Sequence, residues 1–555
     1  MGKVVLIGVD CGNLDLIMKW IDELPTFKSL IENGASGRIA STFPANTVPA
    51  WNCIFSGKNP GKLGVYDFVT IPYYAPHGLE PASYKLTKTN YLWNILSKNS
   101  VRSAIINVPI TFPPEEIEGI MVSGGLLTPF YKETRFTFPS ELKEEINRIS
   151  GGYEILPFTD LTIPGKEEEY LQKILSNIEK QTRVVTYLMQ KYDWDFLTYV
   201  FFVTDSVQHY FWHHIDPSHP RYVENIQNPW RDAIKTVYRR VDAKLGEILS
   251  KLPSESDVLL TSDHGSGPLH NYFLVNEWLK KSGFLALRDS RPHNSYSEVW
   301  LWRGKNFLLK NFPHLSEKMA SALPRRFTSR FLVKGQLRNS YQELINRVDW
   351  TKTKAYGIGS DGAIFVNLKG REPNGIVAKE DYETVRSEII SRLHEIRNPA
   401  TGQELAVETY RREEVYNGDY AELAPDILYI LDGLKYEQRA DIGFRTVWRP
   451  SYTSGGHSPH GAFIAFGRNI RRDGKRIEGS CIYDITPTIL HMLGIPIPDD
   501  LDGHVLKEIF PEGSEIRERS PQYRHYSLEH GKSVPSFTDA EEKQVRERLE
   551  KLGYM

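Results

Sequence analysis

Apolar runs that alternate with helical segments constrain the fold of this chain more than any other feature. Residues 3–9 (KVVLIGV) form a β-branched run without a polar face, which is typical of strands buried in a parallel sheet. Residues 14–32 follow with helical spacing, which is broken at Pro25. Because strands and helices keep alternating further along, we predict a mostly parallel sheet with helices on both faces. Residues 425–431 and 461–466 are expected to be later strands of the same sheet.

The same pattern divides the chain into an α/β core, an insertion and a tail. Residues 286–349 are basic and aromatic and lack the strand and helix rhythm, so we interpret them as an insertion or cap. The expected core therefore comprises residues 1–285 and 350–510. Residues 511–555 form a charged tail whose last part is expected to be one exposed helix. The polar and aromatic residues 70–84 are expected to form a loop that, with the insertion, sets ligand specificity.

The composition is that of a folded globular protein. The chain has 555 residues, of which 40% are hydrophobic and 25% charged, and its formal net charge is −2. This balance gives no electrostatic reason to expect a surface that binds nucleic acid or membranes. The three cysteines are far apart and lack metal-ligand spacing, which favours a reducing compartment. Because no leader-like segment or membrane-length apolar run is evident, we expect a cytoplasmic, untethered protein. The sequence does not indicate an oligomeric state.

Thr47 lies where a predicted strand ends and a predicted helix begins. The strand ends at Pro44, and residues 48–55 carry apolar side chains at helical spacing. A hydroxyl residue at a helix start is usually a plain cap. The same position also suits a nucleophile, because the unpaired N–H groups and the positive dipole of a helix N-terminus attract phosphate. The other polar motifs decide between these two interpretations.

Four clusters of acidic or histidine residues lie at the ends of predicted strands or in adjoining loops, which is where open α/β sheets bind ligands. The residues are Asp10; Asp205 and His209, which share a face if their segment is helical; Asp263 and His264; and His457 with His460 in the loop SGGHSPHG. Each residue alone is usually a turn, cap or surface residue. Together, the aspartates and histidines form the donor mixture that suits zinc, with manganese as the alternative.

The order of these motifs resembles the alkaline phosphatase superfamily, and within it the type I phosphodiesterase/nucleotide pyrophosphatase branch. The matching elements are Asp10, Thr47 in FPANTVPAW, Asp205 and His209 in TDSVQH, residues 263–265 (DHG), His457, and residues 484–503 (DITPTILHMLGIPIPDDLDG). The resemblance covers roughly residues 1–285 and 350–510. It implies a three-layer α/β/α sandwich with insertions, and a small-molecule phosphate ester as substrate.

The resemblance also implies roles for the polar residues. One zinc ion would be held by Asp10, Thr47, Asp263 and His264, and a second by Asp205, His209 and His457. Two divalent ions about 4 Å apart can clamp the attacking and leaving oxygens of a phosphoryl displacement. Thr47 would attack phosphorus, and an activated water would hydrolyse the resulting phosphothreonine. We therefore expect a two-metal hydrolase of phosphodiester or pyrophosphate bonds.

Two positions need separate comment. The phosphodiesterase branch has an asparagine downstream of the nucleophile that binds a phosphate oxygen. Here that position is Phe68, whose side chain cannot donate a hydrogen bond. His460 competes with His457 as a metal ligand, because both lie in one loop. We favour His457, which stands closer to the family spacing before GAFIAFG.

Several other functions are compatible with this fold. A sulfatase nucleophile motif (Cys/Ser-x-Pro-x-Arg) would overlie residues 47–51, but its Cys or Ser and its Arg are absent. A phosphoglycerate mutase-like phosphotransfer would need a serine nucleophile and a different insertion. Hydrolysis of phosphomonoesters or phosphonates, and a metal-stabilised binding protein without turnover, stay open. Retention of Thr47 beside every expected ligand argues against the binding protein.

The surroundings of Thr47 favour diesters over monoesters. A monoester carries two negative charges, yet the nearest downstream cation is Lys58. Trp51, Tyr66 and Phe68 offer flat apolar surface on which a leaving group can stack. We therefore predict that catalytic efficiency on a diester exceeds that on the matching monoester by at least about tenfold.

Overall fold

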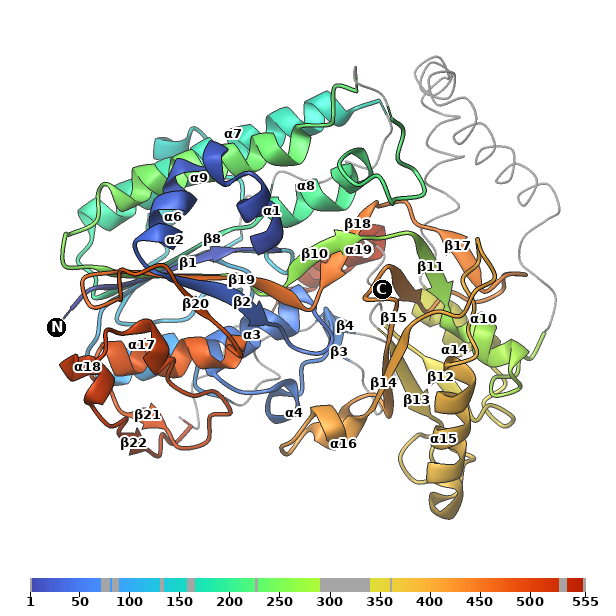
Figure 1. Cartoon of the computed structure of the whole chain (residues 1–555). Coiled ribbons are helices and arrows are strands. Elements are labelled where there is room, and N and C mark those ends of the chain that lie inside the picture. Colours follow the sequence, from blue (N-terminus) through green and yellow to red (C-terminus); the bar gives the residue numbers. More distant parts are fainter. Residues whose placement is uncertain are drawn as a thin grey trace.

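The computed structural model describes residues 2–70, 80–81, 89–129, 134–156, 165–224, 228–289, 340–359, 362–528 and 537–552. Within these stretches the chain forms two lobes, each built on its own sheet (Figure 1). Most of the predicted insertion 286–349 and of the predicted loop 70–84 lies outside the described residues. Their expected roles in specificity stay predictions.

A nine-stranded sheet forms the centre of the first lobe. Its strands are, in spatial order, β20 (Lys475–Ile477), β2 (Ala35–Ala40), β19 (His460–Gly467), β9 (Asp257–Thr261), β1 (Val4–Val9), β8 (Phe196–Phe201), β5 (Ser103–Val108), β6 (Gly119–Ser123) and β7 (Thr137–Phe138). β19 and β7 run antiparallel to their neighbours, and the other pairings within this sheet are parallel. The predicted mostly parallel sheet is confirmed.

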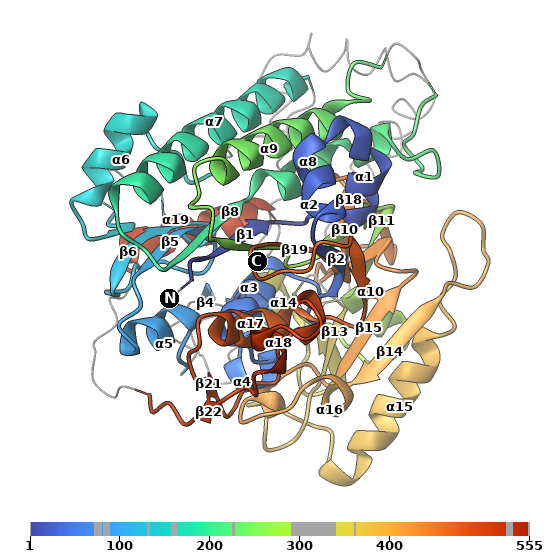
Figure 2. The ribbon, with the colours of Figure 1, turned by 60° about the vertical axis from the view of Figure 1, so that its left-hand side comes forward.

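Helices cover both faces of this sheet, as Figures 1 and 2 show. One layer consists of α1 (Leu14–Lys19), α2 (Pro25–Glu32), α6 (Leu142–Ser150), α7 (Glu167–Lys191), α8 (Val203–Phe211) and α9 (Ala233–Leu249); the other contains α3 (Thr47–Ser56), α4 (Pro60–Leu63), α5 (Leu92–Lys98), α17 (Ile485–Met492) and α18 (Glu515–Glu518). Successive residues of β1 face the two layers in turn, so Leu6 and Ile7 lie in different apolar cores. Both faces of β1 are therefore buried, which explains its continuous apolar run. The predicted three-layer α/β/α sandwich is confirmed.

The second lobe has a separate sheet, built from strands between residues 271 and 450. Its strands are β12 (Ala355–Gly357), β13 (Ala363–Val366), β15 (Ile427–Leu431), β16 (Tyr436–Arg439), β11 (Asn271–Leu274) and β17 (Trp448–Pro450), with β14 (Val407–Arg411) paired to β15. Its helices include α10 (Val275–Lys281), α14 (Ser340–Arg347), α15 (Tyr382–Leu393) and α16 (Arg412–Val415). The expectation that residues 425–431 return to the central sheet is wrong. β15 is fully buried between antiparallel neighbours, so its sequence is as apolar as that of a central strand.

A two-stranded ribbon connects the lobes. β10 (Gly265–Pro268) leaves the first lobe just after β9, and β18 (Gly455–Ser458) returns just before β19. The two strands pair antiparallel, with Ser266 opposite His457. β19 then joins the central sheet, as expected for residues 461–466, but in the antiparallel direction. The ribbon thus brings together two segments that are far apart in the sequence.

The C-terminal helix α19 (Asp539–Leu552) packs into the molecule. Val545 and Leu549 are fully buried in an apolar cluster that also contains residues of the second lobe. Arg548 donates hydrogen bonds to the carbonyls of Leu126 and Thr128, in the loop that follows β6. The expectation of an exposed helix is therefore wrong for the side of α19 that carries Val545 and Leu549. Val545 and Leu549 are four residues apart, so they share one side of the helix. This apolar side is hard to recognise in the sequence, because most of the residues around it are charged.

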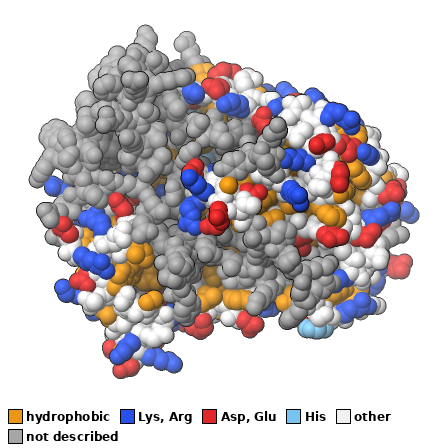
Figure 3. All heavy atoms as spheres, turned by 180° about the vertical axis from the view of Figure 1, so that it is seen from behind, with side chains coloured by type: hydrophobic (Ala, Val, Ile, Leu, Met, Phe, Trp, Pro, Cys, Tyr) orange, Lys and Arg blue, Asp and Glu red, His pale blue; other side chains and the backbone are white. Residues whose placement is uncertain are grey.

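The remaining strands form small pairs: β3 (Val69–Thr70) with β4 (Glu80–Pro81), and β21 (Ile497–Pro498) with β22 (Tyr523–Arg524). Acidic and basic side chains are interspersed over the described part of the face seen in Figure 3. None of the helices in the described stretches is both long enough and apolar enough to cross a membrane.

Candidate metal centre

Three adjacent strands of the central sheet bring the predicted site residues to one edge. β9, β1 and β8 are neighbours and run parallel, so their carboxyl ends lie side by side. Asp10 is the residue after β1, while Asp263 and His264 closely follow β9. α8 begins just after β8 and carries Asp205 and His209. The sheet therefore gathers these five side chains from three separate parts of the chain.

Thr47 is the first residue of α3, as predicted, but it is not the cap of that helix. Asn46 is the cap, and its side-chain oxygen accepts a hydrogen bond from the N–H of Val48. The Thr47 hydroxyl is left for another partner, and its oxygen lies 3.2 Å from Nε2 of His264. Thr47 is 4% exposed, so this contact is shielded from bulk water. The plain-cap interpretation of Thr47 is therefore wrong, and its hydroxyl faces the cluster of candidate metal ligands.

Asp10, Asp263 and His264 form one group of potential metal ligands. One ligand atom from each lies within 4.8 Å of the others, and all three residues are fully buried. Trp51 Nε1 donates to Oδ2 of Asp10 at 2.9 Å, and the N–H of Cys11 donates to Oδ1 of Asp263 at 3.1 Å. Each bond occupies one carboxylate oxygen and leaves the other without a hydrogen bond. The free oxygens and Nε2 of His264 are the atoms that a metal ion would bind.

A second group of potential ligands consists of Asp205, His264 and His457. His209 lies beside it, with its Nε2 3.1 Å from Oδ1 of Asp205, because the two residues are four apart on α8. Nε2 of His457 lies 3.6 Å from the same oxygen. The rings of His264 and His457 are stacked with centroids 4.0 Å apart. His264 therefore belongs to both groups, which differs from the expected assignment of four residues to one ion and three to the other.

Backbone carbonyls orient all three histidines of the site. Nδ1 of His209 faces the carbonyl of Gly455 at 2.8 Å, and Nδ1 of His457 faces that of Ala45 at the same distance. Nδ1 of His264 lies 3.1 Å from the carbonyl of Gly265. In each ring the other nitrogen, Nε2, points toward the aspartates. Such bonds fix the ring orientation of metal-binding histidines.

Burial and neighbouring charges shift the pKa values of several side chains in the site. Burial, together with the carboxylates of Asp263 and Asp205, holds the pKa of Asp10 well above its usual value. Burial alone lowers the pKa of His209, but the nearby Asp205 carboxylate outweighs it and raises that pKa to about 9. Burial and the ring of His264 lower the pKa of His457. Three buried carboxylates within one site favour a cation beside them.

Unsatisfied atoms show that this donor set fits divalent cations. Five buried atoms face the site without a hydrogen-bond partner among the described residues: Oδ1 of Asp10, Oδ1 of Asp205, Nε2 of His209, Oδ2 of Asp263 and Nε2 of His457. Leaving so many buried polar atoms unpaired is costly unless another group binds them. Carboxylate oxygens and neutral imidazole nitrogens are common zinc ligands. The residues therefore fit the expected metal ions.

His460 lies apart from this centre. It is the first residue of β19, pairs with Ala40 of β2 and has an exposed side chain. His457 is mostly buried and faces Asp205 instead. The geometry supports the choice of His457 over His460 within their shared loop.

The aromatic residues near Thr47 do not form a stacking surface. Trp51 is fully buried, while Tyr66 and Phe68 are 7% and 1% exposed. Phe68 packs in the apolar cluster that also contains Val48, and Tyr66 packs against Tyr416. The expectation that these three rings would hold a leaving group is therefore wrong. Their positions are those of core residues.

Trp51 has a role that its sequence position alone does not reveal. Its indole N–H holds Asp10, and its ring approaches β1 at Gly8, where an added Cβ would lie 2.5 Å from the ring. A glycine within a strand often marks such a close approach, so Gly8 was the available signal. Cys11 also lies close to the site, and its thiol donates to the carbonyl of Gly265 at 3.2 Å.

Comparisons with known proteins place the chain in a family. No curated protein matches it. Among solved structures, it is similar to murine ectonucleotide pyrophosphatase/phosphodiesterase 5 in an inactive form in complex with AMP, with a TM-score of 0.47 and 12% identity over 92% of this chain and 100% of that chain. The human counterpart gives a TM-score of 0.47 and 12% identity over 89% of this chain and 95% of that chain. The model of one family, type I phosphodiesterase/nucleotide pyrophosphatase, matches residues 4–436. This match spans most of the chain, which therefore belongs to the type I phosphodiesterase/nucleotide pyrophosphatase family, as its motif order predicted.

Proposed function

We propose that this protein is a metal-dependent hydrolase that cleaves phosphodiester or pyrophosphate bonds and uses Thr47 as its nucleophile. The observation that carries the proposal is the 3.2 Å contact between the Thr47 hydroxyl and Nε2 of His264. His264 is a member of both groups of potential ligands. Family membership supports the reaction class. The substrate would be a small-molecule phosphate ester, because the family name describes such esters.

The residues that would hold two divalent ions are those of the two ligand groups together with His209 and Thr47. When bound, two such ions supply positive charge that favours the Thr47 alkoxide, activates a water and offsets charge on the phosphate oxygens. Zinc is the ion that the mixture of aspartates and histidines suits best, and manganese is the alternative.

The protein itself positions the nucleophile. Asn46 caps α3 and fixes the residue that follows it, while burial limits the access of water to the hydroxyl. The bond from Thr47 Oγ1 to phosphorus forms as the bond from phosphorus to the leaving oxygen breaks. Hydrolysis of the phosphothreonine then returns the hydroxyl and releases the second product. The N-terminal end of α3 faces this reaction with its positive dipole, which favours a bound phosphate.

The test compares two chromogenic esters before and after metal removal. We expect hydrolysis of bis(p-nitrophenyl) phosphate by the purified protein, loss of activity after dialysis against a chelator, and recovery with Zn²⁺ or Mn²⁺. Thr47→Ala should abolish turnover but retain bound metal. Full activity of chelated protein would exclude the metal-dependent mechanism, and an active Thr47→Ala variant would exclude the proposed nucleophile. Turnover of p-nitrophenyl phosphate alone would indicate a phosphomonoesterase instead.

A further inference from the structure

A loop of the second lobe reaches across to the segment that carries Thr47. We call residues 412–426 the bridging loop; it begins at α16 and ends where β15 begins. Its two ends are fixed to each other, because Arg412 Nη1 donates to Oδ1 of Asp426 at 3.1 Å. The loop therefore leaves the second lobe and returns to it at one point.

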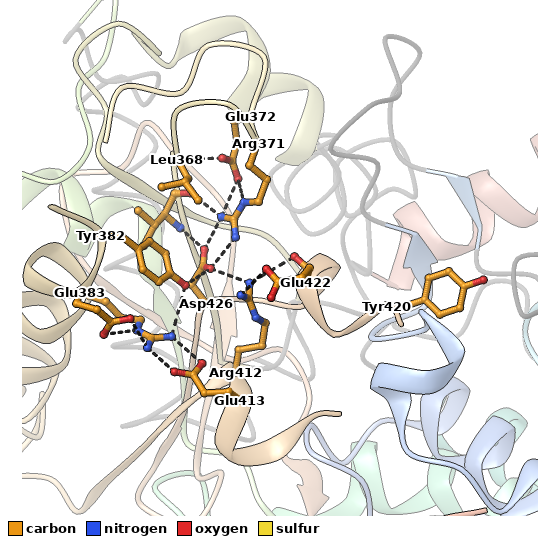
Figure 4. Close-up of polar contacts among 12 residues, drawn as sticks. Leu368, Arg371, Glu372, Tyr382, Glu383, Arg412, Glu413, Tyr420, Glu422 and Asp426 are labelled. Atoms are coloured by element: carbon orange, nitrogen blue, oxygen red, sulfur yellow. Dashed lines mark hydrogen bonds and ion pairs between the residues drawn. The ribbon is translucent and has the colours of Figure 1, made fainter. Parts of the chain in front are cut away.

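The base of the bridging loop is held by a buried ionic network, which Figure 4 shows. Asp426 is fully buried, and Arg371 donates to both of its carboxylate oxygens at 2.7 and 2.6 Å. Tyr382 donates its hydroxyl to Oδ1 at 2.6 Å, and the N–H of Val366 donates to Oδ2 at 2.7 Å. A buried carboxylate with this many donors has a single well-defined position. The base of the loop is thus rigid.

The tip of the bridging loop packs against the first lobe. Tyr420 lies away from the ionic network, beside the blue ribbon of the first lobe in Figure 4. Its N–H donates to the carbonyl of Gly61 at 2.9 Å, and its carbonyl accepts from the hydroxyl of Tyr66 at 2.6 Å. Gly64, at φ +73°, has no side chain, and a Cβ there would lie 3.2 Å from the Tyr420 ring. Contact between loop and first lobe is therefore close and specific.

Tyr416, in the middle of the loop, contacts the turn just before Thr47. Its hydroxyl donates to the carbonyl of Phe43. The Tyr416 ring packs edge-on against Tyr66, with centroids 5.0 Å apart. The Phe43 ring itself packs edge-on against Tyr410 of β14, with centroids 5.3 Å apart. Both the backbone and the side chain of Phe43 are therefore held by the second lobe.

The carbonyl groups of this turn have donors from three different places. The carbonyl of Pro44 accepts from its own neighbours, Thr42 Oγ1 at 2.6 Å and the N–H of Asn46 at 3.0 Å. The carbonyl of Ala45 faces Nδ1 of His457, in the ribbon that connects the lobes. The carbonyl of Phe43 depends on Tyr416. Each bond limits how the backbone can move just ahead of the nucleophile.

We propose that the bridging loop positions the turn that carries Thr47, and that Tyr416 is the positioning residue through which it acts. The proposal rests on the function proposed above. Tyr416 does not touch the reacting atoms; its hydroxyl restrains the backbone four residues before Thr47. Since small displacements of a nucleophile slow the chemical step more than they weaken substrate binding, the effect belongs in kcat.

The experiment removes one hydroxyl at a time. Tyr416→Phe should lower kcat by about five- to tenfold, with KM, metal content and melting temperature close to those of the wild type. Tyr526→Phe is the matched control, because its hydroxyl also donates to a backbone carbonyl, that of Pro496, outside the site. Hydrogen–deuterium exchange at residues 43–48 should be faster in Tyr416→Phe and unchanged in the control. Tyr410→Leu removes the ring that packs against Phe43. It should lower kcat and speed exchange at residues 43–48, as Tyr416→Phe does.

The outcomes separate this proposal from the proposed function. A wild type that hydrolyses no phosphate ester refutes the function, while exchange at residues 43–48 still tests the role of Tyr416. If Tyr416→Phe keeps wild-type exchange and kcat, the positioning role is wrong. A loss confined to KM, or one explained by lost metal, also overturns it.

Discussion

Nε2 of His264 lies 3.2 Å from the hydroxyl oxygen of Thr47, although 217 positions separate the two residues in the chain. His264 also has a ligand atom in each of the two potential metal-binding groups. Nε2 of His264 therefore lies between the hydroxyl of Thr47 and the candidate ligands of both groups.

Replacement of any one ligand is expected to empty one metal position. This includes His264, because its Nδ1 faces the carbonyl of Gly265 and its Nε2 has a single lone pair, which can bind one ion. Wild-type protein should bind about two zinc ions, and Asp10→Ala, His264→Ala and His457→Ala about one each. The measurement is metal content by mass spectrometry after dialysis against Zn²⁺ and desalting. His460→Ala is the control and should match the wild type, because its side chain is exposed. Two ions retained by His264→Ala would show that this residue is not a metal ligand.

Trp51→Phe should weaken the metal centre, because it removes the hydrogen bond to Asp10 and its smaller ring leaves a cavity at this fully buried position. A buried hydrogen bond to a carboxylate contributes about 1.5–3 kcal/mol, so the free energy of unfolding and the zinc affinity should both fall. Trp93→Phe is the control: its indole also donates to a carboxylate, that of Glu115, at 2.9 Å. Chemical denaturation and a competitive zinc titration measure the two quantities. Equal loss of zinc affinity in both variants would contradict a specific role for Trp51.

Strand ends are the part of this site that sequence reasoning predicted best. The apolar runs before Asp10 and Asp263 mark where β1 and β9 stop, and parallel strands that neighbour each other place such residues together. That Asp205 and His209 share one face of α8 could likewise be predicted from the period of an α-helix alone. These local patterns suffice because the residues directly follow the elements that position them.

Features that depend on pairing between distant segments were not predictable in the same way. The stacking of His264 on His457 follows from the antiparallel ribbon of β10 and β18, which neither segment reveals alone. β15 has the apolar sequence of a central strand, but its partners belong to the second sheet. Phe68 is equally apolar whether it lines a substrate site or a core, and only the tertiary fold buries it.

Acid should destabilise the protein partly through His219, which is buried away from the candidate metal centre. In its neutral form, Nε2 donates to the carbonyl of Leu269 at 3.0 Å and Nδ1 accepts from the N–H of Arg221 at 3.0 Å. Burial lowers the pKa of His219 to about 4, below its value in the unfolded chain. The unfolded state therefore binds more protons between these two values, and stability falls as the pH drops through this range.

Between pH 7 and pH 5 this residue should cost about 2 kcal/mol of the free energy of unfolding, from the difference between its two pKa values. His219→Gln should be less stable than the wild type at pH 7, but should lose about 2 kcal/mol less on acidification over the same interval. Urea denaturation at the two pH values measures both quantities. Parallel pH dependence of the two proteins would show that His219 does not titrate as expected.

Substrate charge is the remaining basis for predicting substrate class, since the aromatic residues around Thr47 are buried. Lys58, the nearest cation after Thr47 in the sequence, forms an ion pair with Asp500 at 2.5 Å and is not available to a phosphate. A monoester brings one more negative charge than a diester and needs a further positive partner to bind as well. The second lobe and the metal ions would have to supply that partner.

We therefore expect kcat/KM for bis(p-nitrophenyl) phosphate to exceed that for p-nitrophenyl phosphate by at least about tenfold, in one buffer and with one metal ion. Lys58→Met should leave this ratio unchanged, because the ammonium group is already paired with Asp500. Thr47→Ala should remove both activities, which ties them to one site. A preference for the monoester would refute the diesterase assignment and leave the metal-dependent mechanism intact, and a change in the ratio in Lys58→Met would show that this lysine reaches the substrate.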